Sequence, residues 1–356
     1  MVSLAALQQA VPIDMQTLTY ASRDGKDLLL DLYRPAGSTR PLPVILFLHG
    51  GGWSGGTRTT GPDFKRFFAQ DGFAMASIEY RLTPSVTFPG NVEDVKTAVR
   101  WLRANAGRLA LDTDRIAIWG TSAGGHLAAV AALSPRGMYE GADNLEQSSA
   151  VQCVLDAYGP VMFTAMDVQT ENENATLQPL ASGLVNAPPM VGGVVTTSAA
   201  GGRGTAAPAA GARAGGPGAM NHDAPNSPES RLVGAPIQTV PDRVKAASPL
   251  TYVAAGAPPF LLMHGLADNS VPHHQSVMLY EALAAAGNTA TLRLIDGLPH
   301  TFFNRTNLDD LAGPFRMDVR ERLAGRPEQT RVDRQGVFDV ARAFFHQHLQ
   351  AGRSSQ

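Results

Sequence analysis

Residues 116–127 read IAIWGTSAGGHL, an apolar run that passes directly into a serine surrounded by small residues. The first four residues, 116–119, have the β-branched and aromatic character of a buried strand. The residues after Ser122 read AGGHLAAVAAL (123–133) and can form a helix. The stretch therefore predicts a strand that ends in a sharp turn at Ser122 and leads at once into a helix.

The turn itself fits the pattern G-x-S-x-G, with Gly120 and Gly124 flanking Ser122. A tight turn from strand to helix tolerates only small neighbours, and it lifts the serine hydroxyl above the edge of the sheet. Chance could produce the bare pattern in a chain with 36 glycines, but the strand before it and the helix after it make it more specific. We expect Ser122 to be a nucleophile; a plain turn with a solvated serine is the alternative.

Short apolar runs alternate with helical patterns along most of the chain. Strands are expected at 28–33, 43–50, 74–80, 115–120, 151–159, 259–265 and 289–296. Helices are expected at 62–70, 90–106, 123–133, 271–286 and 332–349. The strands from Val44 onward are continuously apolar, as in strands that are buried on both faces. The pattern predicts an α/β fold with a mainly parallel sheet flanked by helices on both faces.

The interval 161–245 breaks this alternation. Its centre, 192–221, is a tract of glycine, alanine and proline with few large side chains, which cannot offset the entropy lost on ordering. We expect a flexible, lid-like insertion after the sixth core strand, which divides the core into 1–160 and 246–356.

Composition excludes several classes of partner. The 356 residues are 44% hydrophobic and 17% charged with a formal net charge of −2, so nothing indicates nucleic acid. No run of about 18 apolar residues predicts a membrane span, and the start lacks a signal-peptide pattern. The sequence as written predicts a cytoplasmic protein, although a secreted or periplasmic protein whose signal had been removed would look the same. Cys153 is the single cysteine, so no intrachain disulfide or multi-cysteine metal site is expected.

A serine hydroxyl needs a base to remove its proton, normally an imidazole oriented by a carboxylate. His300 lies in DGLPHTFF, just after the last apolar run, and Asp268 lies in MHGLADNSVP, just after another. The chain order serine, aspartate, histidine is typical of α/β-hydrolases. We therefore expect Ser122, Asp268 and His300 to act together as nucleophile, orienting acid and base. Asp296 is the alternative acid, although it belongs to a strand end.

Attack on a carbonyl also develops negative charge on its oxygen, which backbone N–H groups must stabilise. The segment HGGGW (49–53) follows an early apolar strand, and its glycines allow close approach of the backbone. We expect an oxyanion hole formed by Gly51, Gly52 and Ala123. The segment lacks the G-K-[ST] ending of a phosphate-binding loop, and no group of metal ligands is evident, so neither a cofactor nor a metal is expected.

The remaining histidines receive structural roles from their positions. His264 belongs to the strand at 259–265, and His126 is expected to pack on or cover its helix. His273 and His274 flank the helix at 271–286, while the two histidines of the terminal helix are expected to face solvent.

At this point the sequence resembles the α/β-hydrolase superfamily, in particular the esterase branch related to hormone-sensitive lipase. Within that branch it most resembles bifunctional feruloyl and acetyl-xylan esterase-type proteins. The resemblance covers nearly the whole chain outside 161–245. It is carried by HGGGW (49–53), EYRL (79–82), VEDVKTAVRWLRANA (92–106), DTDRIAIWGTSAGGHLAA (112–129), ASPLTYV (247–253), PPFLLMHGLADNSVP (258–272) and LPHTFF (298–303).

The resemblance implies an α/β-hydrolase fold and a carboxylesterase that works through an acyl-enzyme intermediate. Its substrates would be short-acyl, aryl or carbohydrate esters, such as acetyl or feruloyl esters. Trp53 and Tyr158 follow strand ends and are candidates to line the substrate pocket; the alternative is that they simply cover the core. An amidase, arylformamidase or peptidase with the same triad is the alternative, as is a non-catalytic ligand-binding module. The sequence makes no prediction of oligomeric state.

Overall fold

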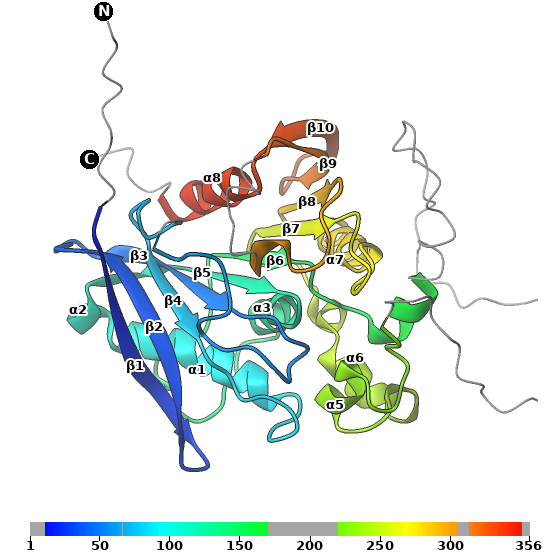
Figure 1. Ribbon diagram of the computed structural model, residues 1–356, viewed down its shortest axis with the longest axis horizontal. Coiled ribbons are helices and arrows are strands. Elements are labelled where there is room, and N and C mark those ends of the chain that lie inside the picture. The colour runs from blue at the N-terminus through cyan, green and yellow to red at the C-terminus, as the bar shows by residue number, and fades with distance from the viewer. Residues whose placement is uncertain (1–10, 66, 170–219, 305–312, 351–356) are drawn as a thin grey trace, which may run out of the picture.

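The computed structural model describes residues 11–65, 67–169, 220–304 and 313–350. In these residues one sheet of ten strands has the order β1-β2-β4-β3-β5-β6-β7-β8-β9-β10 (Figure 1). The strands are β1 (Ile13–Arg23), β2 (Lys26–Pro35), β3 (Leu42–Leu48), β4 (Ala74–Ile78), β5 (Leu111–Thr121), β6 (Cys153–Ala157), β7 (Phe260–Gly265), β8 (Ala290–Ile295), β9 (Phe315–Arg322) and β10 (Gln329–Gln335). The α-helices are α1 (Gly90–Ala104), α2 (Ala106–Leu109), α3 (Ala123–Leu133), α5 (Pro228–Val233), α6 (Pro241–Ala247), α7 (His274–Ala285) and α8 (Val337–Gln350).

The centre of the sheet is parallel, from β4 through β3, β5, β6 and β7 to β8. Every residue of β4, β6 and β7 is buried, which explains why these strands read as continuous apolar runs. Antiparallel strands flank the centre on both sides, β1 and β2 at one edge and β9 and β10 at the other. The expected mainly parallel sheet is therefore confirmed.

Helices cover both faces of this sheet. On one face Leu46 belongs to a core that includes residues of α1, α3 and α7. On the other face Phe47 and Trp119 belong to a core with residues of α8, among them Phe345. Alternate residues of the same strand thus point into two separate cores, as the period of a strand requires.

The prediction of a helix at 62–70 is wrong, because the described residues of this segment form turns. Phe64, Phe67 and Phe68 are all buried in the second core, and Phe68 has a positive φ of 60°, which a helix does not allow. The helix expected at 332–349 begins later than predicted, at Val337, because residues 332–335 belong to β10.

The sequence reading missed β1, β9 and β10. In β1 and β10 most side chains are exposed or half-buried and polar, so neither strand gives an apolar run. Their strand conformation comes from pairing with β2 and β9.

Most of the tract expected to be flexible, 192–219, lies outside the described residues. The described part that follows, from Met220 onward, carries α5 and α6, which lie side by side in Figure 1.

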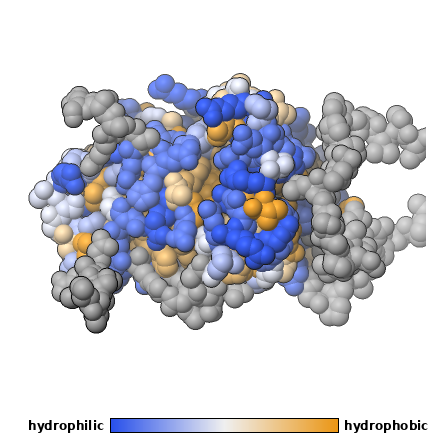
Figure 2. All heavy atoms as spheres, turned by 90° about the horizontal axis from the view of Figure 1, so that it is seen from above, coloured by the Kyte–Doolittle hydropathy of each residue, from blue (hydrophilic) through white to orange (hydrophobic). Residues whose placement is uncertain are grey.

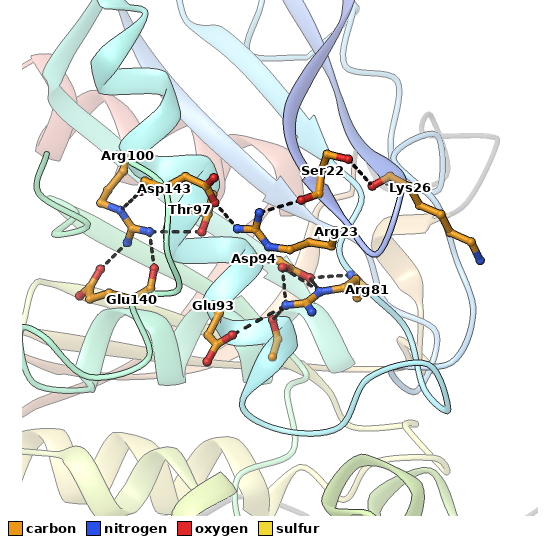
Figure 3. Close-up of polar contacts among 11 residues, drawn as sticks. Ser22, Arg23, Lys26, Arg81, Glu93, Asp94, Thr97, Arg100, Glu140 and Asp143 are labelled. Atoms are coloured by element: carbon orange, nitrogen blue, oxygen red, sulfur yellow. Dashed lines mark hydrogen bonds and ion pairs between the residues drawn. The ribbon is translucent and has the colours of Figure 1, made fainter. Parts of the chain in front are cut away.

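A buried polar network attaches the loop at 134–150 to the helix α1 (Figure 3). Arg100 of α1 is 1% exposed; it forms an ion pair with Glu140, and its Nε donates to the carbonyl of Asp143 at 2.9 Å. Asp143 in turn pairs with Arg23 at the end of β1. Because a buried guanidinium needs several acceptors, this loop is held at a fixed place beside α1.

Arg81 makes a second attachment to the same helix. Its guanidinium donates to both carboxylate oxygens of Asp94, at 2.9 to 3.1 Å, and its backbone N–H donates to Asp94 at 2.9 Å. The EYRL segment that follows β4 is thereby fixed to α1.

The face seen in Figure 2 is largely hydrophilic, with hydrophobic residues in small patches. None of the helices in the described part of the chain combines the length and apolar character needed to cross a membrane.

Candidate active site

Ser122 lies at the turn between β5 and α3 with φ 55° and ψ −123°, a strained conformation for a residue with a side chain. Its N–H donates to the carbonyl of Ala157 at 2.8 Å, which holds the turn against β6. A Cβ on Gly120 would lie 2.1 Å from the carbonyl oxygen of Gly124, and a Cβ on Gly124 would lie 2.2 Å from that of Leu48. The turn therefore forms only with glycine at both positions.

The structure brings the three predicted side chains into contact. Nε2 of His300 lies 2.9 Å from Oγ of Ser122, and Nδ1 of His300 lies 2.6 Å from Oδ2 of Asp268. Ser122 follows β5, Asp268 follows β7 and His300 follows β8, so all three lie at the carboxyl edge of the parallel strands. A carboxylate only accepts hydrogen bonds, so Nδ1–H donates to Asp268, and Nε2 is left to accept from the serine hydroxyl.

Asp268 is 6% exposed; it accepts three hydrogen bonds and lies within ion-pair distance of a fourth group. Oδ1 accepts from the N–H groups of Ser270 and Val271, both at 2.9 Å, while Oδ2 contacts His300 and, at 3.2 Å, Nε2 of His264. Burial alone would raise the pKa of Asp268, but the hydrogen bonds and charges of His264 and His300 outweigh it and hold that pKa below its ordinary value. Asp268 is therefore ionised at neutral pH.

His264 is a second imidazole on the same carboxylate, and the sequence analysis gave it only a strand position. It is fully buried in β7; Nδ1 lies 2.8 Å from Oγ of Ser276, and Nε2 lies 2.9 Å from the carbonyl of Val271. The spacing of His264 and Asp268, four residues apart across a strand end, is the signal that could have identified the contact.

The glycine loop 50–52 faces the same space as Ser122. Gly51 and Gly52 have positive φ values of 118° and 56°, which leave room for the backbone to turn toward the serine. Ala123 is the first residue of α3, where N–H groups have no acceptor within the helix. Gly51, Gly52, Ala123, Ser122 and His300 all line one cavity of about 290 Å³.

The EYRL segment holds the glycine loop in place. The hydroxyl of Tyr80 donates to the carbonyl of His49 at 2.8 Å, and the His49 ring stacks on Tyr80 with centroids 4.4 Å apart. The N–H of Thr83 donates to the carbonyl of Trp53 at 2.8 Å. Burial lowers the pKa of His49 to about 4, so this stacked ring is neutral at pH 7.

Of the two aromatic residues expected in the pocket, Trp53 lines the cavity and Tyr158 does not. The indole N–H of Trp53 donates to Nδ1 of His126 at 3.2 Å, and Nε2–H of His126 donates to the carbonyl of Ala247 at 2.7 Å. Burial lowers the pKa of His126 to about 4. Tyr158 lies behind the cavity, with its ring 4.8 Å from that of His300.

The rest of the cavity wall comes from the insertion, the Asp268 loop and the His300 loop. Its lining residues include Met220, His222, Pro228, Glu229, Ser270 and Thr301. None of these residues had a predicted role. Those of the insertion lie in or just after the glycine-rich tract, which carries no periodic signal.

The alternative acid, Asp296, pairs with Arg316 at 3.3 Å, whereas Asp268 is the carboxylate that contacts His300. His274 begins α7 and His273 precedes it, as expected. Among the described residues, no group of three or more histidines, cysteines or carboxylates is arranged to hold a metal ion.

This combination of sheet order, strained serine turn and glycine loop defines the α/β-hydrolase class. The chain belongs to the BD-FAE family, which is feruloyl esterase-like: the family model matches residues 30–195 and 214–283. The resemblance inferred from the sequence motifs is therefore confirmed.

Individual relatives agree with this assignment. The chain is 29% identical to esterase LipC and 30% identical to esterase LipQ of Mycobacterium tuberculosis, over 77% and 74% of its length. The matched regions cover 57% and 51% of those proteins, so the chain spans little more than half of the curated relatives that it matches. A solved structure of esterase Est2 from Thermogutta terrifontis with propionate bound is 26% identical, with a TM-score of 0.58, and covers 84% of this chain and 89% of that one.

Proposed function

We propose that the chain is a serine-dependent carboxylic ester hydrolase that forms an acyl-enzyme intermediate. The observation that carries the proposal is the continuous series of contacts from Ser122 through His300 to Asp268, which opens into a cavity beside the glycine loop. Family membership supports ester hydrolysis, and the contacts supply the nucleophile, the base and the orienting acid.

In the first half-reaction Nε2 of His300 accepts the proton of Ser122 as Oγ attacks the ester carbonyl. The oxygen of the tetrahedral intermediate accepts hydrogen bonds from the N–H groups of Gly51, Gly52 and Ala123. His300 then gives its proton to the leaving alcohol. Ionised Asp268 stabilises the imidazolium that exists between these two transfers.

In the second half-reaction His300 removes a proton from water, which attacks the acyl-enzyme. The same N–H groups stabilise the second tetrahedral intermediate, and return of the proton to Ser122 releases the acid. Each step uses groups of this chain and water alone.

The size of the cavity favours esters with short acyl groups. At about 290 Å³ it lies at the lower end of the range for small-molecule sites, about 300 to 1,000 Å³. The propionate in the Est2 structure is the kind of acid that such an ester would release. We therefore place acetyl esters first, with feruloyl and other aryl or carbohydrate esters as further substrates that a panel of acetyl, butyryl, octanoyl and feruloyl esters would rank.

The replacement Ser122→Ala tests the nucleophile. We expect kcat for 4-nitrophenyl acetate to fall by at least about a thousandfold, because no other group forms the acyl-enzyme. The thermal unfolding midpoint should change little, and Ser22→Ala on the exposed β1–β2 hairpin is the matched control. A fluorophosphonate should label the wild type and the control but not Ser122→Ala; turnover that survives in Ser122→Ala would contradict the proposal.

A further inference from the structure

A buried ion pair forms part of the wall of the cavity that holds Ser122. Nδ1 of His222 lies 2.9 Å from Oε1 of Glu229, and the side chains are 2% and 3% exposed. Both residues line the cavity that holds Ser122 and His300. Charged groups are rare in so enclosed a place unless they are paired or bind something.

The position of Glu229 follows from the start of α5. Oγ of Ser227 accepts from the N–H of Ser230 at 3.1 Å and so caps this short helix. A Cβ on Gly52 would lie 3.2 Å from Cβ of Pro228, so the first residue of α5 abuts the glycine loop. Glu229 is the next residue, and it therefore lies beside the space in which an ester bound to Ser122 must fit.

His222 holds the carboxylate of Glu229 in position through Oε1. Its Nδ1–H donates to Glu229, and its Nε2–H donates to the carbonyl of Ser270 at 2.8 Å, so both ring nitrogens carry hydrogen. Burial alone would lower the pKa of His222, but the hydrogen bond and charge of Glu229, with smaller effects of Asp167 and Ser270, outweigh it and raise that pKa. The ring also joins the insertion to the loop that carries Asp268.

The second carboxylate oxygen of Glu229 is not satisfied in this arrangement. Oε2 is buried and has no hydrogen-bond partner within the part of the chain that the structure describes. A buried carboxylate oxygen without a donor is costly, and such atoms in a site call for an explanation. A bound substrate that donates a hydrogen bond to Oε2 would explain why this atom has no partner within the protein.

We propose that Glu229 is a specificity-determining residue that accepts a hydrogen bond from a hydroxyl group close to the ester bond of the substrate. The inference rests on the proposed ester hydrolysis and adds to it the class of ester that is preferred. A hydroxyl fits better than an ammonium group, because the pair of Glu229 and the His222 imidazolium is neutral overall and offers no net attraction to a cation. His222 is then a positioning residue, which acts through Glu229.

Three small acetates of similar size separate the possibilities. In 2-hydroxyethyl acetate the alcohol carries a donor, in propyl acetate a methyl group takes its place, and in 2-methoxyethyl acetate the same oxygen can only accept. The measured quantity is the ratio of kcat/KM for 2-hydroxyethyl acetate to that for propyl acetate, followed by acid release at constant pH. Uniform losses of activity cancel in this ratio.

For the wild type we expect a ratio of at least about ten, the usual effect of a hydrogen bond to a charged acceptor. Glu229→Met should reduce the ratio to about one. Glu229→Gln places an amide N–H₂ toward the substrate, so it should improve 2-methoxyethyl acetate relative to propyl acetate. His222→Gln, which releases Oε1, should lower the ratio without a matching loss for propyl acetate.

Glu146→Gln is the matched control, since Glu146 is exposed on the loop after α3 and its variant should keep the wild-type ratio. A wild-type ratio near one, measured while propyl acetate is hydrolysed normally, would overturn the inference without any variant. So would an unchanged ratio in folded Glu229→Met. Absence of hydrolysis of all three acetates and of 4-nitrophenyl acetate would instead refute the proposed function itself.

Discussion

Asp268 illustrates how single residues set the chemistry of this site. Two imidazoles share its Oδ2, while two backbone N–H groups hold Oδ1. In the proposed mechanism the contact with His300 orients the base; the second contact comes from His264, which is fully buried in β7. Because a one-ångström displacement of a catalytic group can cost about a hundredfold in rate, the second imidazole matters for the first.

The replacement His264→Gln tests this arrangement. We expect kcat for short esters to fall by about tenfold while KM changes little, because Asp268 loses a neighbour that fixes its orientation and the substrate loses no contact. Ser276→Ala, which removes only the partner of Nδ1, should have a smaller effect in the same direction.

His348→Gln on α8 is the control for these two variants, because its ring packs on Phe344 in the core on the other face of the sheet. It should leave both constants unchanged. If folded His264→Gln keeps the wild-type kcat, the second imidazole has no role in positioning Asp268.

At the scale of the elements, the turn between β5 and α3 depends on close backbone approach. Gly124 lets α3 pack directly on the end of β3, and Gly120 lets the chain reverse beneath it. Both positions were predictable because the pattern G-x-S-x-G encodes this approach in residue types.

We predict that Gly124→Ala destabilises the protein by about 3 kcal/mol or more, because its Cβ would overlap the carbonyl of Leu48. Gly107→Ala in α2 is the control: no atom lies within 4 Å of the added Cβ and φ is not positive, so stability should rise slightly, by at most about 1 kcal/mol. Urea unfolding of both variants measures the difference. If Gly124→Ala were as stable as the wild type, α3 would be able to move away from β3 without a cost in free energy.

Other elements could not be predicted from the sequence. The segment 62–70 has helical spacing of apolar residues, but in the structure its three phenylalanines fill the core beneath α8 from a series of turns. In β1 and β10 the side chains are mostly polar, so their sequences lack the sustained alternation of apolar and polar residues that predicts a strand. The contact of His222 with the carbonyl of Ser270 joins the insertion to the Asp268 loop, and this tertiary contact has no signal in the sequence.

At the scale of the whole molecule, buried titratable groups make stability depend on pH. The pKa of His126 is lowered to about 4 in the folded protein, against an ordinary value of about 6.5. The unfolded chain therefore binds the proton first as pH falls, so this group contributes stability above pH 6.5 that is lost between pH 6.5 and 4.

We predict that the difference in unfolding free energy between wild type and His126→Gln shrinks as pH falls through this window. The expected slope is about 1.4 kcal/mol per pH unit. Denaturant unfolding at pH 7.0, 5.5 and 4.5 measures it. A difference that is independent of pH would show that His126 titrates normally in the folded state.

Asp156 should make the free energy of unfolding change with pH in the opposite direction. It is fully buried, with one oxygen bound to the N–H of Gly159 at 3.0 Å and the other without a partner among the described residues. Burial raises its pKa to about 7, against the opposing effects of Gly159 and His264. Its contribution to stability is therefore complete below about pH 4 and is lost as pH rises toward 7.

Asp156→Asn removes this titration. We expect the variant to gain stability relative to wild type as pH rises from 4 to 7, measured by the same unfolding experiment. A constant difference across that range would mean that Asp156 ionises freely in the folded protein.

The β9–β10 ribbon at one edge of the sheet affects how the protein associates with itself at high concentration. Without the β9–β10 ribbon, the largely apolar strand β8 would be an open rim along which a second molecule could add its own strand. Instead the rim is β10, in which every residue except Val332 is polar or charged, and its charged residues are Arg331, Asp333 and Arg334. A second molecule that paired there would have to place its own strand beside these charges. The polar ribbon that the sequence pattern concealed thus discourages fibrous self-association.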